Sequence, residues 1–193
     1  MQLSLVGLSH HTAPLEVRER LHFPEKDLPA ALHRLREMQN VEEAVIFSTC
    51  NRVEVLARLA DGAEPVPLVA SFLAEMRRVG REAFEASLYH HRQRDAVRHV
   101  FRVAASLDAM VVGEPQILGQ VKAAYATARA VGALGGVLDE VMTHAFAAAK
   151  KVRAETGVAS AAVSVSYAAV ELAKKIFGSL EGKKVFLIGA GEM

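Results

Sequence analysis

The sequence has a single cysteine, no tryptophan and no long apolar run, and its positive and negative charges almost cancel. One cysteine excludes an internal disulfide, and no Cys/His pair has the spacing of a zinc site, so the cysteine usage suits a reducing cytoplasm. No uncharged apolar stretch approaches the roughly 20 residues that cross a bilayer, and the first residues lack the basic region of a secretion signal. We therefore expect a soluble, cytoplasmic protein with no metal site and no membrane partner.

The composition is that of a globular protein. Of 193 residues, 51% are hydrophobic and 23% are charged, which suits one or two domains. The formal net charge is only +1, so any surface for nucleic acid must come from local clustering of basic residues.

The N-terminal half alternates strand and helix patterns. Apolar alternation predicts strands at 3–8, 44–47 and 53–57, and a short fourth strand at 86–89. Asp27, followed by Pro29, begins one helix, and Pro65 with Pro67 begins another. The order βαββαβ is that of a ferredoxin-like sandwich, so we predict an α+β fold whose loops at one end of the sheet carry the site.

Beyond residue 92 the pattern is helical. Asp95 is expected to cap one helix, Glu114 and Pro115 to begin a second, and a third spans about 134–154. These added helices complete a first predicted domain over residues 1–156, to which the family resemblance described below assigns catalysis and substrate binding. A fourth helix runs from about 165 to Gly178, a typical residue after a helix C-terminus.

The last residues change character. An apolar strand at 185–188 runs into Gly189, Ala190, Gly191, Glu192 and Met193, which is half of the glycine fingerprint of a dinucleotide-binding fold. The alternative is a strand followed by a simple glycine turn. On the first interpretation, residues 157–193 are the lead-in helix and first strand of a truncated Rossmann domain, residues 189–193 contact its cofactor, and the chain is part of a longer protein.

Cys50 lies where an apolar strand gives way to the polar turn 48–52. A thiol at the end of a buried strand, with Arg52 two residues on, is placed like a nucleophile. The alternative is a small buried hydrophobe without chemistry, which is the commoner fate of a free cysteine. Taken alone, the residues leave both interpretations open.

Four segments, in this order, resemble the glutamyl-tRNA reductase family: residues 7–14 (GLSHHTAP), 48–52 (STCNR), 111–122 (VVGEPQILGQVK) and 162–167 (AVSVSY). The resemblance implies an enzyme whose cysteine attacks the aminoacyl ester of glutamyl-tRNA(Glu) and forms a thioester. NADPH then reduces the thioester to glutamate-1-semialdehyde, the first step of five-carbon tetrapyrrole (heme) synthesis. The resemblance also implies a homodimer at full length and hand-off of the product to glutamate-1-semialdehyde aminotransferase.

The resemblance assigns roles to individual residues. Cys50 is the nucleophile, and His99 is a base or a proton donor to the departing tRNA hydroxyl. Arg52 has two roles open, since it grips the substrate carboxylate through parallel hydrogen bonds or stabilises the thiolate. Thr49 and Asn51 offer a hydroxyl and an amide to the glutamyl group, or serve only the turn. The remaining predicted substrate-binding positions are Ala109, Glu114, Pro115, Gln116 and Gln120.

Two positions depart from the family's pattern. The family usually has a serine where this chain has Ala109, which removes one hydroxyl hydrogen bond, worth about 0.5–1.5 kcal/mol, from substrate binding. A lysine is typical where this chain has His11, and we expect that difference to matter little.

A further cluster and a rival function remain. Seven arginines between residues 77 and 102 stand against three acidic residues, which predicts either a surface for tRNA phosphates or an ordinary solvated face.

The rival function is that of a ferredoxin-like RNA-binding module without catalysis. Such modules stack bases on aromatic residues of their central strands, and neither 3–8 nor 53–58 contains one. A phosphorylating aldehyde dehydrogenase is disfavoured, because its nucleophile follows the nucleotide domain.

Overall fold

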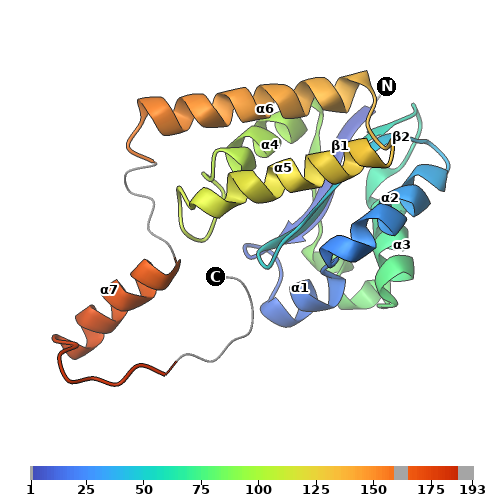
Figure 1. The fold of residues 1–193 in the computed structure, drawn as a ribbon. Coiled ribbons are helices and arrows are strands. Elements are labelled where there is room, and N and C mark those ends of the chain that lie inside the picture. The colour runs from blue at the N-terminus through green and yellow to red at the C-terminus, as the bar shows by residue number, and fades with distance from the viewer. Residues whose placement is uncertain (1, 159–164, 187–193) are drawn as a thin grey trace.

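The computed structural model in Figure 1 describes residues 2–158 and 165–186. Four strands form one sheet in the order β2-β3-β1-β4, and every neighbouring pair is antiparallel. Their bounds are β1 (Gln2–Ser9), β2 (Val41–Ser48), β3 (Arg52–Leu59) and β4 (Tyr89–Arg92). The structure confirms the predicted α+β class.

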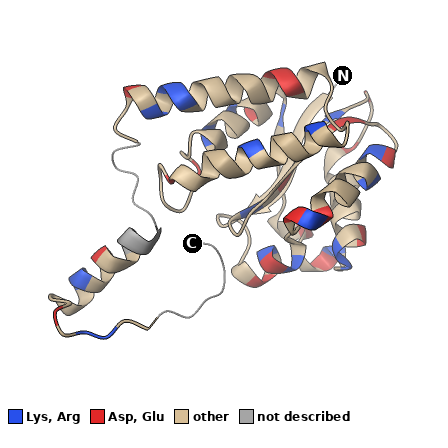
Figure 2. Ribbon diagram, in the orientation of Figure 1, with Lys and Arg blue, Asp and Glu red and all other residues tan. Residues whose placement is uncertain are grey.

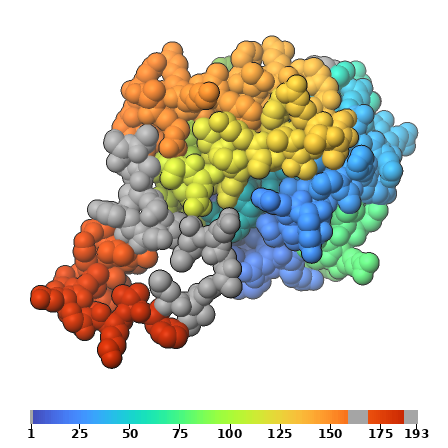
Figure 3. Space-filling model, viewed as in Figure 1, coloured from blue at the N-terminus to red at the C-terminus, as the bar shows by residue number. Residues whose placement is uncertain are grey.

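Helices cover both faces of the sheet. The first face carries α1 (Leu15–Leu21), α2 (Leu28–Glu37) and α3 (Pro65–Arg77). The second face carries α4 (Gln93–Ala104) and α6 (Gly136–Glu155), while α5 (Pro115–Ala130) packs along the edge strand β2 and contacts helices of both faces. α7 (Val165–Phe177) follows in the chain. In Figure 3, α6, α5 and α2 lie side by side on one surface of the molecule. None of the described helices has the length and apolarity needed to cross a membrane.

The central strands are buried along almost their whole length. Leu5 and Leu8 of β1 and Leu56 of β3 are fully inaccessible to solvent, as is Phe72 of α3. Such continuous burial follows from a sheet that is covered on both faces, where neither side of a strand meets water. Polar side chains on the second face therefore need partners within the protein.

Several predicted helix starts are confirmed. Asp27 is the N-cap of α2 with a proline in the first turn, and α3 begins at Pro65. Glu114 is the N-cap of α5, which begins at Pro115. α7 ends at Phe177, and Gly178 has a φ of +72°, the left-handed conformation that glycine adopts without strain.

Other predictions are wrong. The fourth strand lies at Tyr89–Arg92 rather than 86–89, where Glu85–Ser87 forms a 3₁₀ turn. This strand is an edge strand of tyrosine, histidines and arginine, so it lacks the apolar alternation that marks a strand in a sequence. Asp95 is not a cap, because α4 begins at Gln93 with Arg92 as its N-cap and Asp95 lies in the first turn. α1 was not predicted.

The predicted strand at 185–188 is only partly within the described residues. Val185 and Phe186 belong to no regular element and are strongly exposed. Residues 187–193, including Gly189, Ala190, Gly191, Glu192 and Met193, lie outside the described residues.

Glu43 of β2 anchors α6 to the sheet. Its carboxylate is 2% exposed and accepts hydrogen bonds from the backbone N–H of Leu138 at 2.7 Å and from Arg58 Nη1 at 3.0 Å. Gly135 permits this approach, because a Cβ there would lie 2.7 Å from Glu43 Oε1. Burial alone would raise the pKa of Glu43, but the N–H donors at the start of α6 and Arg58 outweigh it and lower that pKa.

We predict that Glu43→Gln lowers the free energy of unfolding by about 1–2 kcal/mol at pH 7, since the helix start and Arg58 lose a charged acceptor. A depressed pKa stabilises the fold above the unfolded pKa of about 4.3, and this contribution disappears as pH falls through the lower folded value. Urea unfolding at several pH values should therefore show the two proteins converging below about pH 4. A difference independent of pH would contradict the role of the charge.

Candidate active site

Cys50 lies in the tight turn between β2 and β3, and its side chain is exposed. The turn closes on itself, because Thr49 N–H donates to the Arg52 carbonyl at 2.9 Å. Thr49 Oγ1 accepts the N–H groups of Asn51 at 3.1 Å and Arg52 at 3.2 Å. These hydrogen bonds give Thr49 a part in holding the turn.

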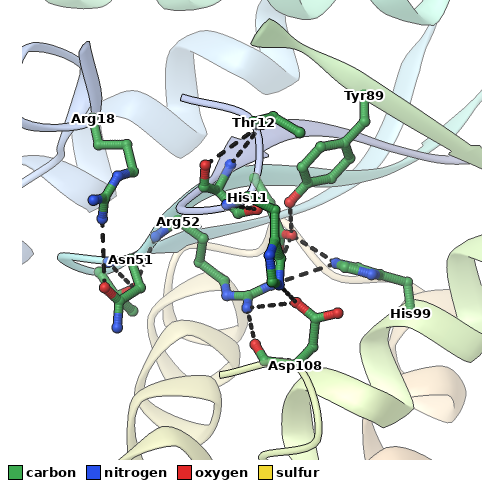
Figure 4. A network of polar contacts seen from close by, with 11 residues as sticks. His11, Thr12, Arg18, Asn51, Arg52, Tyr89, His99 and Asp108 are labelled. Carbon is green, nitrogen blue, oxygen red and sulfur yellow. Dashed lines mark hydrogen bonds and ion pairs between the residues drawn. The ribbon is translucent and has the colours of Figure 1, made fainter. Parts of the chain in front are cut away.

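Arg18 of α1 fixes this turn from the side. Its Nη1 donates to the Cys50 carbonyl and, at 3.4 Å, to Asn51 Oδ1, while Nε donates to the Ala13 carbonyl at 3.3 Å. Figure 4 shows Arg18 reaching across to Asn51. Although it is an arginine, Arg18 is only 9% exposed. It was missed in the sequence because nothing local distinguishes it from the other charged residues of that helix.

A polar network fills the second face of the sheet beside this turn. Arg52 is held by Glu54 Oε1 at 3.0 Å from Nη1 and by Asp108 Oδ1 at 3.0 Å from Nη2, and Nη2 also donates to the Asp108 carbonyl. His99 Nε2 lies 2.6 Å from Glu54 Oε1, and the Tyr89 hydroxyl donates to the same oxygen. Figure 4 shows His99 and Asp108 linked to Arg52, with the Tyr89 hydroxyl pointing into the same cluster.

Strand register explains how these residues meet. Gly7 of β1 pairs with Glu54 on one side and with Tyr89 on the other, so the three lie in one row across the sheet. A Cβ on Gly7 would lie 2.8 Å from Glu54 Cγ, so a glycine is required here to leave room for the Glu54 side chain. Glu54, Tyr89 and Asp108 were not predicted as site residues, because their partners are distant in sequence.

The network determines the charge of its members. Burial alone would raise the pKa of Glu54, but Arg52 and the hydrogen bonds from His99 and Tyr89 hold that pKa below its usual value. Burial alone would lower the pKa of Arg52, but Glu54 and the other acidic neighbours raise it. Burial and the Glu54 charge raise the pKa of Tyr89, so its hydroxyl stays protonated and donates. The centre is therefore an ionised Arg52–Glu54 pair.

Two cavities border this pair. The first, of about 680 Å³, is lined by Cys50, Thr49, Arg52 and Gln120 together with residues of α2 and α5. The second, of about 520 Å³, is lined by His99, Tyr89, His91 and Asp108. Cys50 and His99 thus line different cavities, and the structure does not bring them into contact. Arg52 connects the two, because it lines the first and its guanidinium contacts His99 and Asp108 of the second.

The other predicted positions lie around α5. Ala109 is 8% exposed and adjoins Asp108 in the loop before this helix. Pro115, Gln116 and Gln120 are exposed, and of the two glutamines only Gln120 lines the cavity that contains Cys50. His11 is exposed, with Nε2 3.8 Å from Asp108 Oδ1. Within residues 2–158 and 165–186, no group of three His, Cys, Asp or Glu side chains is placed to hold a metal ion.

The model of the family "Glutamyl-tRNAGlu reductase, N-terminal domain" matches residues 6–156. The chain belongs to this family. It is 56% identical over 193 residues to the glutamyl-tRNA reductase of Solibacter usitatus, covering 100% of this chain and 46% of that protein. It is 53% identical to glutamyl-tRNA reductase 2 of Koribacter versatilis, covering 100% of this chain and 44% of that protein.

A solved glutamyl-tRNA reductase from Methanopyrus kandleri has the same fold over this region. The TM-score is 0.70 at 37% identity, and the match covers 98% of this chain and 44% of that one. The chain thus spans about half the length of the glutamyl-tRNA reductases it matches. The family match confirms the resemblance to glutamyl-tRNA reductases that the four sequence segments indicated.

We predict that Glu54→Gln destabilises the chain by about 3 kcal/mol, because it leaves a buried guanidinium without its main counter-charge. The matched control is Glu42→Gln, whose partner Arg58 lies 2.9 Å away in a partly exposed ion pair. This control should cost about 0–1 kcal/mol. Urea unfolding of both variants at pH 7 makes the comparison, and equal losses would contradict the central position of Glu54.

Proposed function

We propose that this chain is the catalytic, substrate-binding part of a glutamyl-tRNA reductase in which Cys50 is the nucleophile. The observation that carries the proposal is the exposed thiol on a turn pinned by Arg18, at a cavity of about 680 Å³ that also contains Arg52. A pinned turn holds a nucleophile in place without ordering cost at the moment of reaction. The family to which the chain belongs supports the substrate, the glutamyl ester of tRNA(Glu).

The first half-reaction is a transfer of the glutamyl group to Cys50. The sulfur attacks the ester carbonyl, a C–S bond forms, and the C–O bond to the tRNA breaks. The thiol releases its proton as the sulfur attacks, and the departing oxygen takes up a proton and leaves as a hydroxyl. Because Cys50 and His99 line different cavities, we assign only the protonation of the departing oxygen to His99. Its Nε2 is held by Glu54, and its Nδ1 has no hydrogen-bond partner among the described residues.

The second half-reaction reduces the glutamyl thioester to glutamate-1-semialdehyde and releases Cys50, giving a precursor of heme. NADPH, when bound, would supply the hydride, and the residues proposed to contact it, 189–193, lie outside the described residues. We propose that the cofactor site belongs to a Rossmann domain beginning near residue 157, and that residues 1–156 bind the substrate. The dimer and the hand-off to an aminotransferase remain proposals for the full-length protein.

Arg52 and its neighbours set the orientation of the substrate in this proposal. Asp108 occupies the outer side of the guanidinium, so a substrate carboxylate reaches Arg52 only in exchange for Asp108. Ala109, next to Asp108, is then the position where the family's serine would add a hydroxyl. Glu114, Pro115, Gln116, Gln120, Thr49 and Asn51 complete the proposed substrate pocket.

The strand order also supports the finer prediction for the fold. We infer a ferredoxin-like core, because α1 and α2 lie between β1 and β2, α3 lies between β3 and β4, and the strands pair in the order β4-β1-β3-β2. The rival RNA-binding module without catalysis is disfavoured, since β1 and β3, its central strands, carry no aromatic residue.

We predict that the chain slowly deacylates glutamyl-tRNA, because water hydrolyses the thioester when no hydride is delivered. Release of free glutamate should depend on Cys50, be indifferent to NADPH, and fall to the uncatalysed rate in Cys50→Ser, since a serine hydroxyl is far less ionised than a thiol. Thin-layer analysis of radiolabelled glutamate measures this. Deacylation that survives Cys50→Ser would contradict the thioester.

For the full-length reductase, we predict that Arg52→Lys loses at least about 100-fold in kcat/KM, nearly as much as Arg52→Ala. An ammonium keeps the charge, but it does not span Glu54 and Asp108 as the two Nη atoms do. Steady-state rates decide between the two roles left open by the sequence. If lysine preserves most of the activity, the role of Arg52 is purely electrostatic.

A further inference from the structure

The arginine cluster of residues 77–102 separates into engaged and unengaged members in the structure. Arg77 lies 3.9 Å from Asp27 and stacks over Phe23, and Arg81 donates to Glu85. In contrast, Arg94, Arg98 and Arg102 of α4 are exposed and have no partner among the described residues. We call these three residues the α4 arginine row.

The α4 arginine row leads into the second cavity. Its members are spaced by four residues, so they follow one face of the helix at intervals of about 6 Å along the axis. Arg98 and Arg102 line the cavity of about 520 Å³ that also contains His99. Two carboxylates also line this cavity. That of Asp108 is bound to Arg52, and that of Asp95 is exposed. Figure 2 shows basic segments on the neighbouring α5 as well, which carries Lys122 and Arg129.

Aromatic rings form another wall of the same cavity. The rings of His91 and His99 are stacked with centroids 4.6 Å apart and planes inclined by 27°. Tyr89 lies 5.3 Å from His91. Planar rings beside a row of unpaired guanidinium groups are the combination by which proteins bind single-stranded nucleic acid, with bases stacked on the rings and phosphates held by arginine.

We propose that the second cavity and the α4 arginine row bind the single-stranded 3′ end of the substrate RNA. Arg94, Arg98 and Arg102 contact successive phosphates, and a base stacks on His91. This inference rests on the proposed function, which supplies an RNA substrate, and it extends that function by assigning the RNA surface. It also places the RNA end beside His99, the proposed proton donor to its departing hydroxyl.

The salt dependence of RNA binding tests the arginine row. Unacylated tRNA(Glu) is titrated against the chain, against Arg98→Ala/Arg102→Ala, and against the control Arg20→Ala/Arg36→Ala. The control removes two exposed arginines of α1 and α2 that have no side-chain partner within the part of the chain that the structure describes, and it changes the net charge equally. We expect the α4 variant to bind at least about tenfold more weakly, with a log–log salt slope reduced by about 1.4, and the control to match the unaltered chain. Equal behaviour of the two variants, or no tRNA binding by the unaltered chain, would overturn the proposal.

A second comparison tests the stacking wall. His91→Ala should weaken tRNA binding by about tenfold, and His91→Phe should restore it, since phenylalanine keeps a stacking face. A tRNA trimmed of its single-stranded 3′ end should bind the unaltered chain more weakly than intact tRNA binds His91→Ala, because it loses the arginine contacts as well as the stacked base. If trimming has no effect, the 3′ end is not the ligand of this cavity.

These measurements use unacylated RNA and no turnover, so they are independent of the chemistry at Cys50. If the α4 arginine variant binds tRNA as well as its control does, the RNA surface lies elsewhere on the protein and the proposed function is unaffected. Failure of the Cys50-dependent deacylation, with RNA binding intact, rejects the proposed function instead.

Discussion

The structure depends on one buried ion pair, between Arg52 and Glu54 on the second face of β3. Neither charge tolerates burial alone, so each needs further partners close by. The fold supplies them from three places: Tyr89 on the edge strand β4, His99 on α4, and Asp108 on the loop before α5. Gly7 on β1 leaves the space that the Glu54 side chain occupies. Holding this pair therefore fixes the edge strand, a helix and a loop at once.

The same pair connects the chemistry to the fold. Arg52 follows Cys50 by two residues, so the turn that presents the thiol continues directly into the strand that carries the buried pair. On one side lies the cavity with Cys50, and on the other the cavity with His99. In the proposed reaction the sulfur acts from the first side and the proton reaches the leaving oxygen from the second. Arg52, bound to Glu54 and Asp108, fixes the positions of these two sides relative to each other.

The sequence predicted those features whose signals are local. Prolines and caps marked the starts of α2, α3 and α5, and the change from apolar to polar residues marked the turn of Cys50. It did not predict the network, because Glu54 alternates with Val53 and Val55 and so resembles the solvent side of a strand. Its burial arises only when α4 and α6 cover that face. Arg18 and Asp108 were missed because their partners lie 32 and 56 residues away in the sequence.

The most direct test of the account is the mass of the chain after brief incubation with glutamyl-tRNA(Glu) and an acid quench. The account predicts a glutamyl adduct in acid, cleaved by hydroxylamine as a thioester is, and peptide mapping should place it on Cys50 alone. An adduct on another residue, or an unmodified chain under conditions where the tRNA binds, would contradict the assignment of Cys50 as the nucleophile.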